Sequence, residues 1–67
     1  MPESDNELTE RERQVAALIA DGASNKEAAL ALGISPRTVE LHRAHIMEKL
    51  GARNAADLVR IVLTRPI

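Results

Sequence analysis

The chain contains no cysteine and no aromatic residue among its 67 residues. Without cysteine, neither a disulfide nor a thiolate zinc site can stabilise the fold. Without Phe, Trp or Tyr, the protein lacks the side chains on which the bases of single-stranded RNA usually stack. These absences favour a small cytoplasmic domain with an aliphatic core over a secreted or RNA-stacking protein.

Long hydrophobic segments are also absent. The longest apolar run, LVRIVL at residues 58–63, is short and contains Arg60, which excludes a membrane span. The polar, acidic N-terminus is not a signal peptide. So short a chain has little room for an enzyme pocket, and no nucleophile–base pair, phosphate loop or paired acidic site is present. His42 and His45 have no further ligands, so we expect no metal, no cofactor and no enzymatic activity.

The charged residues are unevenly distributed, although the net charge is only −1. Residues 1–32 carry three basic and seven acidic groups, whereas residues 33–67 carry six basic and three acidic groups and both histidines. A basic half can bind a polyanion even when the whole protein is nearly neutral. From charge alone, an ordinary solvated surface explains the pattern about as well.

Two helices are predicted in the first half of the chain. Each begins at a capping box, in which Ser or Thr is followed three residues later by Glu. The pairs are Thr9 with Glu12 and Ser24 with Glu27. Gly22 and Gly33 are placed to end these helices. The buried stripe of the first is predicted to be Val15, Leu18 and Ile19.

Two more helices are predicted in the second half. Ser35 caps the third helix with Pro36 at its first position, and Gly51 ends it. Asn54 caps a fourth helix that continues to about Thr64. No strand-like alternation or hairpin turn is present.

The second and third helices are separated only by the short turn Gly-Ile-Ser, which is typical of a helix-turn-helix. We therefore predict an all-α fold, a four-helix bundle whose recognition helix spans about Pro36–Leu50. Residues 1–7 show no apolar periodicity and are predicted to form a flexible acidic tail or linker. Residues 8–67 form the domain.

The third helix has an unusual outward side. If Val39, Ile46 and Leu50 face the core, the helical period turns a second set of residues outward. That set is Arg37, Leu41, Ala44 and Glu48, with Glu40 and His45 beside it.

Leu41 could be one scattered surface leucine, which needs no functional cause. A DNA-binding role explains more of this set. Ala44 permits close approach in a major groove and Leu41 can contact a thymine methyl group. Glu40 can accept from a cytosine amino group, and Arg37 can reach guanine or phosphate.

Several motifs resemble the LuxR/FixJ family of four-helix DNA-binding domains in bacterial transcription regulators. They are LTERERQV at residues 8–15, NKE at 25–27 and SPRTVELHRAHIMEKL at 35–50. The likeness covers residues 8 to about 63 and is closest to the output domains of two-component response regulators. It implies sequence-specific binding to double-stranded DNA by a transcriptional regulator, and it makes RNA polymerase a candidate partner.

The resemblance also implies roles for individual residues. The base-facing positions would be Arg37, Glu40, Leu41 and Ala44. Contacts to the DNA backbone would come from Asn25, Lys26, Ser35, Thr38, Arg43 and Lys49, although Lys49 has an alternative partner within the fold, Glu12.

This chain departs from the family pattern at four positions. Many relatives carry Lys or Arg where Glu40 and Ala44 stand, which leaves the operator sequence open. Ala16 and Ala28 replace Leu and Ile of relatives, so either the first two helices pack closer or Leu30 fills the space.

The fourth helix carries more apolar residues than one core stripe needs: Leu58, Val59, Ile61, Val62 and Leu63. One interpretation wraps all five around the core; the resemblance favours the other, in which Leu58, Val59 and Val62 form a homodimer contact.

Two other functions remain open. One is a sigma-factor region-four-like DNA-binding module, and the other is a helical protein-interaction domain that has lost DNA binding.

Overall fold

A computed structural model of the chain describes residues 8–64. It contains four helices: α1 (Glu10–Ala20), α2 (Asn25–Leu32), α3 (Pro36–Leu50) and α4 (Ala55–Thr64). The all-α prediction and the bounds predicted for the recognition helix are confirmed. The tail or linker predicted for residues 1–7 lies outside the described residues.

Side-chain caps begin the helices where the sequence indicated. Thr9 Oγ1 accepts from the Glu12 backbone N–H at 3.2 Å, while Glu12 Oε1 accepts from the Thr9 N–H at 2.9 Å. Ser24 and Glu27 form the same reciprocal pair at the start of α2. Each box satisfies two backbone donors that have no partner within the helix.

The turn between α2 and α3 depends on Gly33. Its φ angle is +69°, in the left-handed region that side chains disfavour, although a Cβ atom there would have no neighbour within 4 Å. The backbone conformation, rather than a lack of space, therefore requires glycine. Ser35 then caps α3 two residues later, which keeps the turn short.

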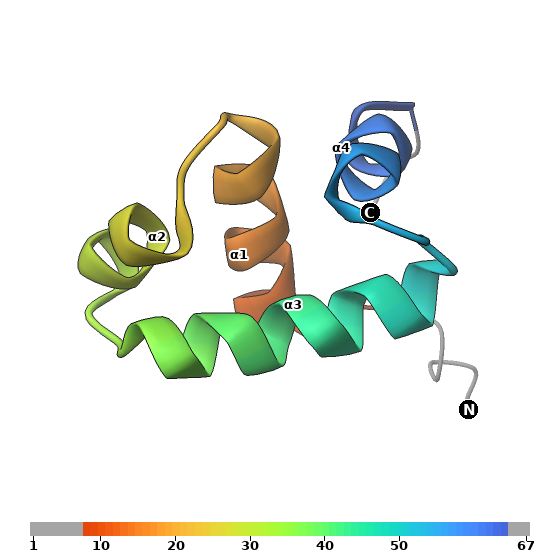
Figure 1. Ribbon diagram of the computed structural model, residues 1–67. Coiled ribbons are helices and arrows are strands. Elements are labelled where there is room, and N and C mark those ends of the chain that lie inside the picture. Colours follow the sequence, from red (N-terminus) through yellow and green to blue (C-terminus); the bar gives the residue numbers. More distant parts are fainter. Residues whose placement is uncertain (1–7, 65–67) are drawn as a thin grey trace.

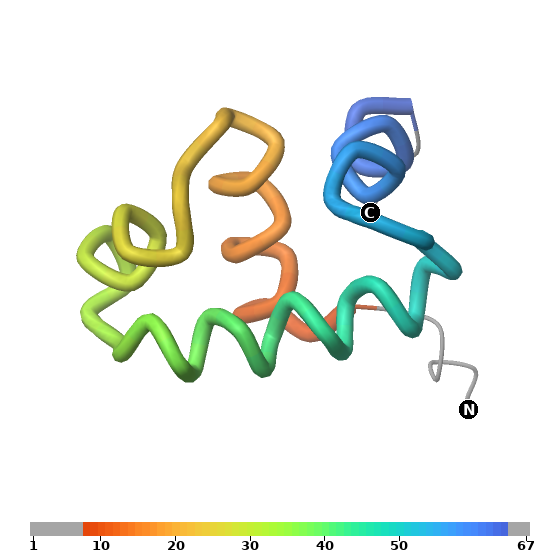
Figure 2. Tube along the Cα trace, viewed as in Figure 1, coloured from red at the N-terminus to blue at the C-terminus, as the bar shows by residue number. Residues whose placement is uncertain are grey.

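The helices are arranged around α3. Figure 1 shows α1 directed at the middle of α3, with α2 and α4 near opposite ends of it. The trace in Figure 2 shows that α1, α2 and α4 all lie on the same side of α3. The other side of α3 is not covered by any part of the described chain.

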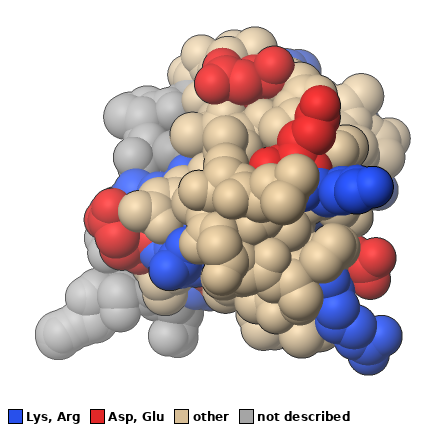
Figure 3. All heavy atoms as spheres, turned by 90° about the vertical axis from the view of Figure 1, so that its left-hand side faces the viewer, with Lys and Arg blue, Asp and Glu red and all other residues tan. Residues whose placement is uncertain are grey.

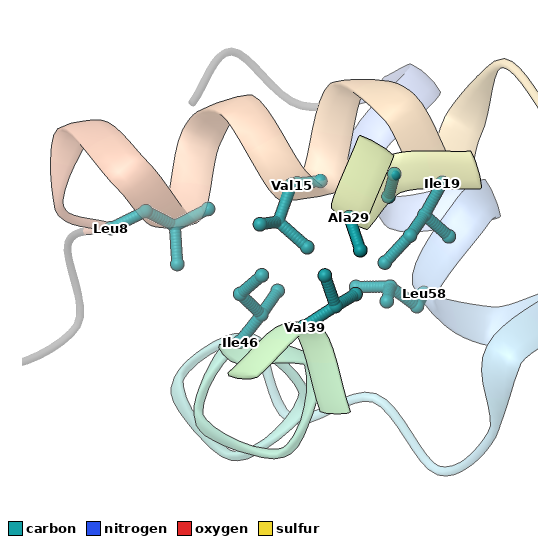
Figure 4. Packing of buried hydrophobic residues seen from close by; sticks show 9 residues of the cluster. Leu8, Val15, Ile19, Ala29, Val39, Ile46 and Leu58 are labelled. Atoms are coloured by element: carbon teal, nitrogen blue, oxygen red, sulfur yellow. The ribbon is translucent and has the colours of Figure 1, made fainter. Parts of the chain in front are cut away.

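The core lies where α1 faces α3. Val15, Val39, Ile46 and Leu58 are fully buried there. In Figure 4, Val15 and Ile19 of α1 point toward Val39 and Ile46 of α3, and Leu58 enters from α4. One apolar cluster therefore joins all the helices and sets the position of α3.

Small residues occupy part of the core. Ala16 and Ala28 are both fully buried, whereas Leu30 is 77% exposed. Leu30 therefore does not fill the space left by the two alanines, and close packing of α1 with α2 is the alternative that remains. The buried apolar residues of α1 are Val15, Ala16 and Ile19. Leu18, predicted to belong to this stripe, is only half-buried. Leu50, predicted to face the core, packs against it while half-buried.

Candidate nucleic-acid interface

The uncovered side of α3 is the first candidate surface. Val39 and Ile46 point into the core with no exposed area, whereas Leu41 is 52% exposed. The exposed residues on this side recur every three or four positions, as one helical face requires. We call them the outer face of α3, and they are Arg37, Glu40, Leu41, Ala44 and Glu48. The orientation predicted for the helix is confirmed; what the face binds remains a prediction.

The outer face of α3 is not strongly basic. It carries one cation, Arg37, and two anions, Glu40 and Glu48, and none of these three side chains has a hydrogen-bond or ion-pair partner within residues 8–64. Figure 3 views the side formed by α2 and the start of α3, where charged groups surround a central uncharged area. Attraction to phosphates contributes most of non-specific DNA affinity. With a single cation, this face offers little general attraction to phosphates.

Two hydroxyl groups lie at the start of α3. Ser35 Oγ accepts from the Thr38 backbone N–H at 3.1 Å, and it lies 2.9 Å from Thr38 Oγ1. One hydroxyl hydrogen is used between the two oxygens, whichever residue donates it. The other hydrogen remains available for a phosphate oxygen near the helix start.

Two predicted backbone-contact residues instead contact each other. The Arg43 guanidinium donates from Nη1 to Asn25 Oδ1 at 2.9 Å, and both side chains are half-buried between α2 and α3. Lys26, the next residue of α2, is exposed and has no polar partner within the described chain. Of these three residues, Lys26 is the cation best placed to reach a phosphate.

The side chain of Lys49 turns inward. Its ammonium lies 2.8 Å from Glu12 Oε1, and Glu12 is only 4% exposed. Burial tends to raise the pKa of Glu12, but hydrogen bonds from Lys49 and Thr9 and the charge of Lys49 together lower it below its ordinary value. The alternative partner considered for Lys49 is therefore the one observed, and a direct contact with DNA is a prediction that this geometry does not favour.

The prediction for the fourth helix needs a correction. Leu58 has no exposed area and belongs to the core, so it cannot form a dimer contact on the surface. Val59 and Val62 are half-buried, so each contributes apolar area both to the core and to the surface. Leu63 is 70% exposed. Once Leu58 and Ile61 are placed inward, the helical period turns Val59 and Leu63 outward together.

Sequence reasoning missed two features of these surfaces. Leu63 could have been found by drawing the helical wheel of α4 around Leu58 and Ile61. The contact between Asn25 and Arg43 joins residues 18 positions apart, and no periodic pattern connects them. Within residues 8–64, no group of three or more His, Cys, Asp or Glu residues could hold a metal ion. None of the described helices is long and apolar enough to cross a membrane.

Comparison with known proteins identifies relatives. The model of the family described as bacterial regulatory proteins, luxR family, matches residues 6–62. Transcriptional regulatory protein UhpA of Escherichia coli K12 is 57% identical over 53 residues, which are 79% of this chain and 27% of UhpA. Transcriptional regulatory protein FixJ of Rhizobium meliloti is 52% identical over 56 residues, or 84% of this chain and 28% of FixJ.

A third relative is the uncharacterized response regulatory protein YgeK of Escherichia coli K12. It is 48% identical over 60 residues, covering 90% of this chain and 41% of YgeK. The chain thus spans well under half the length of each of these three relatives. Comparison with solved structures gave no significant match.

Proposed function

This chain belongs to the luxR family of bacterial regulatory proteins as a DNA-binding helix-turn-helix domain, and we propose that it reads double-stranded DNA with the outer face of α3. In this proposal α3 lies in the major groove, the groove in which all four base pairs present distinct donor and acceptor patterns. The proposed activity is sequence-specific binding, and the domain catalyses no reaction.

One observation carries the proposal: α3 is buried along one side and uncovered along the other. Val39 and Ile46 anchor the helix, while Leu41 projects from the outer face. Ala44 keeps that face narrow enough for close approach to base edges. The side chains of this face add little to the stability of the domain, because all of them are exposed.

The proposed contacts fall into two classes. Base edges are read by Arg37, Glu40, Leu41 and Ala44. Phosphates are contacted by Asn25, Lys26, Ser35 and Thr38. Contacts of the second class set the register of the helix, and contacts of the first class specify the sequence.

Salt dependence tests the proposal directly. A preferred duplex is first selected from a random library, and affinity is then measured at several salt concentrations. If Lys26 of each of two copies neutralises one phosphate, log affinity should fall with log salt with a slope of about −2. Absence of selected duplexes, or binding that salt does not weaken, would contradict DNA binding through this surface.

Substitutions separate the two classes of contact. Glu40→Ala and Leu41→Ala should change which duplexes are selected, because each removes a group proposed to touch base edges. Lys26→Ala should lower affinity for all duplexes alike. Unchanged selection by both α3 variants would show that another side of the helix enters the groove.

We also propose that two copies associate through α4. The contact surface consists of Val59, Val62 and Leu63, with Leu58 assigned to the core. One short helix gives a small interface, so the dimer should be weak in solution. Two adjacent half-sites on DNA would raise the effective concentration of the second copy and so favour pairing.

The proposed cellular role follows from the relatives, whose names describe transcriptional and response regulatory proteins. We propose that this domain serves as the output part of a response regulator acting on promoters in the cytoplasm. RNA polymerase is a proposed further partner. Leu30 on α2 is 77% exposed and lies outside the surfaces proposed for DNA binding and for dimerisation, so it offers an apolar contact for this partner.

A further inference from the structure

The contact between Arg43 and Asn25 has a fixed polarity. A guanidinium has five N–H donors and no acceptor. Since Arg43 Nη1 lies 2.9 Å from the Asn25 side-chain amide, it is the amide oxygen that must face Arg43. The oxygen and the NH₂ group of the amide diverge from one carbon within a single plane, so with the oxygen on Arg43 the NH₂ group of Asn25 points in another direction.

Asn25 stands where a phosphate donor is useful. It is the first residue of α2 and follows the cap residue Ser24. Its amide oxygen is already used, which leaves Nδ2–H as the side-chain donor. With Arg43 holding the oxygen, the amide cannot turn over, so this donor keeps one direction before DNA arrives.

Arg43 itself lies away from the outer face of α3. At about 100° per residue, Arg43 falls about 120° around the helix from Arg37. That position borders the buried stripe of Val39 and Ile46, and the side chain is half-buried. A cation in this position can hold α2 against α3, whereas Lys26 extends into solvent beside it.

We propose that Arg43 is a positioning residue, which orients the Asn25 side-chain amide so that Nδ2–H donates to a DNA phosphate, and which does not contact DNA itself. The proposal rests on the proposed DNA-binding function and changes the role that the resemblance implied for Arg43. It assigns the phosphate contact to the neutral amide of Asn25, whose direction is set by the charged guanidinium of Arg43.

The salt slope distinguishes positioning from direct contact. Arg43→Met removes the guanidinium but keeps much of the apolar stem. Affinity for the selected duplex should fall about tenfold, since one oriented hydrogen bond is lost. The salt slope should equal that of the wild type, because a neutral amide releases no counterion. If Arg43 binds phosphate directly, the slope per copy should become shallower by about 0.9.

Lys26→Met is the matched control. It removes a neighbouring cation that the proposed function places directly on phosphate. Its slope should become shallower by about 0.9 per copy, which shows that the measurement can detect a single lost phosphate contact. A wild type without salt-dependent duplex binding would refute the proposed function. Normal binding by the wild type with a reduced slope for Arg43→Met would refute this inference alone.

A second variant distinguishes the loss of a DNA contact from a loss of folding. In Asn25→Asp, a carboxylate still accepts from Arg43, so the melting temperature should match or exceed that of the wild type. The NH₂ donor is lost and a negative charge faces the phosphate, so affinity should fall at least tenfold. The double variant Asn25→Ala/Arg43→Met should bind no worse than Asn25→Ala. Additive losses would show that the two residues act independently and would overturn the proposal.

Discussion

The helices α3 and α4 both pack on the core, but different contacts hold them. α3 buries Val39 and Ile46 and also makes two polar contacts with other helices, from Arg43 to α2 and from Lys49 to α1. α4 buries Leu58 and Ile61. Its polar side chains that have described partners bond within α4 or to residues immediately before it.

Polar contacts between helices allow this small domain to orient α3 more strictly than α4. Apolar contact is non-directional, so it decides which side of a helix is buried but fixes the exact rotation about the axis less sharply than a polar contact does. Arg43 and Lys49 lie on opposite flanks of the buried stripe of α3, each about 120° around the helix from Arg37, near the centre of the outer face. Rotation of α3 in either direction would stretch one of the two polar contacts. A helix that reads base edges needs this constraint, and a helix that forms a weak dimer contact does not.

The largest expected effect is the loss of folding stability when the core residue of α4 is shortened. Leu58→Ala should lower the free energy of unfolding by about 2–5 kcal/mol, because it opens a cavity in the core. Leu63→Ala, the control on the same helix, should change it by no more than about 0.5 kcal/mol. Urea denaturation of dilute protein measures both values. Equal losses would show that Leu63 is packed and that the division of α4 into core and surface is wrong.

The next effect concerns the exposed part of α4. Leu63→Glu should lower affinity for a duplex with two half-sites about 100-fold, because it removes pairing of the two copies. Affinity for a single half-site should be unchanged. Leu30→Glu is the control, since Leu30 is 77% exposed and Leu63 is 70% exposed. Sedimentation with and without DNA reports assembly, and equal behaviour of the two variants would argue against a dimer through α4.

A smaller loss is expected at the polar contact between α3 and α1. Lys49→Met should destabilise the domain by about 1–3 kcal/mol at neutral pH, because it leaves the Glu12 carboxylate buried without its cation. Sedimentation should show no change in assembly, which separates this effect from that of α4.

The loss caused by Lys49→Met should depend on pH. The folded wild type holds the pKa of Glu12 below its ordinary value of 4.5, so the stability from this group is present above that pH and is lost as the pH falls through the folded pKa. The variant lacks this contribution, so the two proteins should converge in stability only as the pH falls below the folded-state pKa of Glu12. Urea denaturation from pH 7 to pH 3 tests this, and a deficit that is the same at every pH would contradict the assigned role of Glu12.

The smallest expected effect comes from removing the cap residues of α3 and α4. Ser35→Ala and Asn54→Ala should each cost about 1 kcal/mol of stability, because each removes an oxygen that accepts a backbone N–H. Among folded molecules, only Ser35→Ala should weaken DNA binding, since Ser35 lies at the start of α3. Calorimetric melting and duplex titration of both variants provide the measurement. Equal loss of DNA affinity would mean that the effect arises from stability alone.

Much of the fold could be predicted because its signals are local. Each predicted cap residue, from Thr9 to Asn54, accepts a hydrogen bond from a backbone N–H three residues away. The period of 3.6 residues placed Val39 and Ile46 inside and Leu41 outside before any tertiary contact was known. In α4 the same period places Leu58 beside Ile61 on the inward side, so Leu58 belongs to the core and not to the predicted dimer contact.

By itself, then, the sequence determined the helices, their ends, the turn at Gly33 and which side of α3 faces solvent, because those depend on neighbours within one or two turns. Only the tertiary structure decided the partners of Asn25 and Glu12, which lie 18 and 37 residues from Arg43 and Lys49. It also decided that Leu30 remains exposed while Ala16 and Ala28 are buried. The physical reason is that a polar side chain on the flank of a helix can reach solvent, DNA or another helix, and the choice depends on where the folded chain brings a partner within about 3 Å.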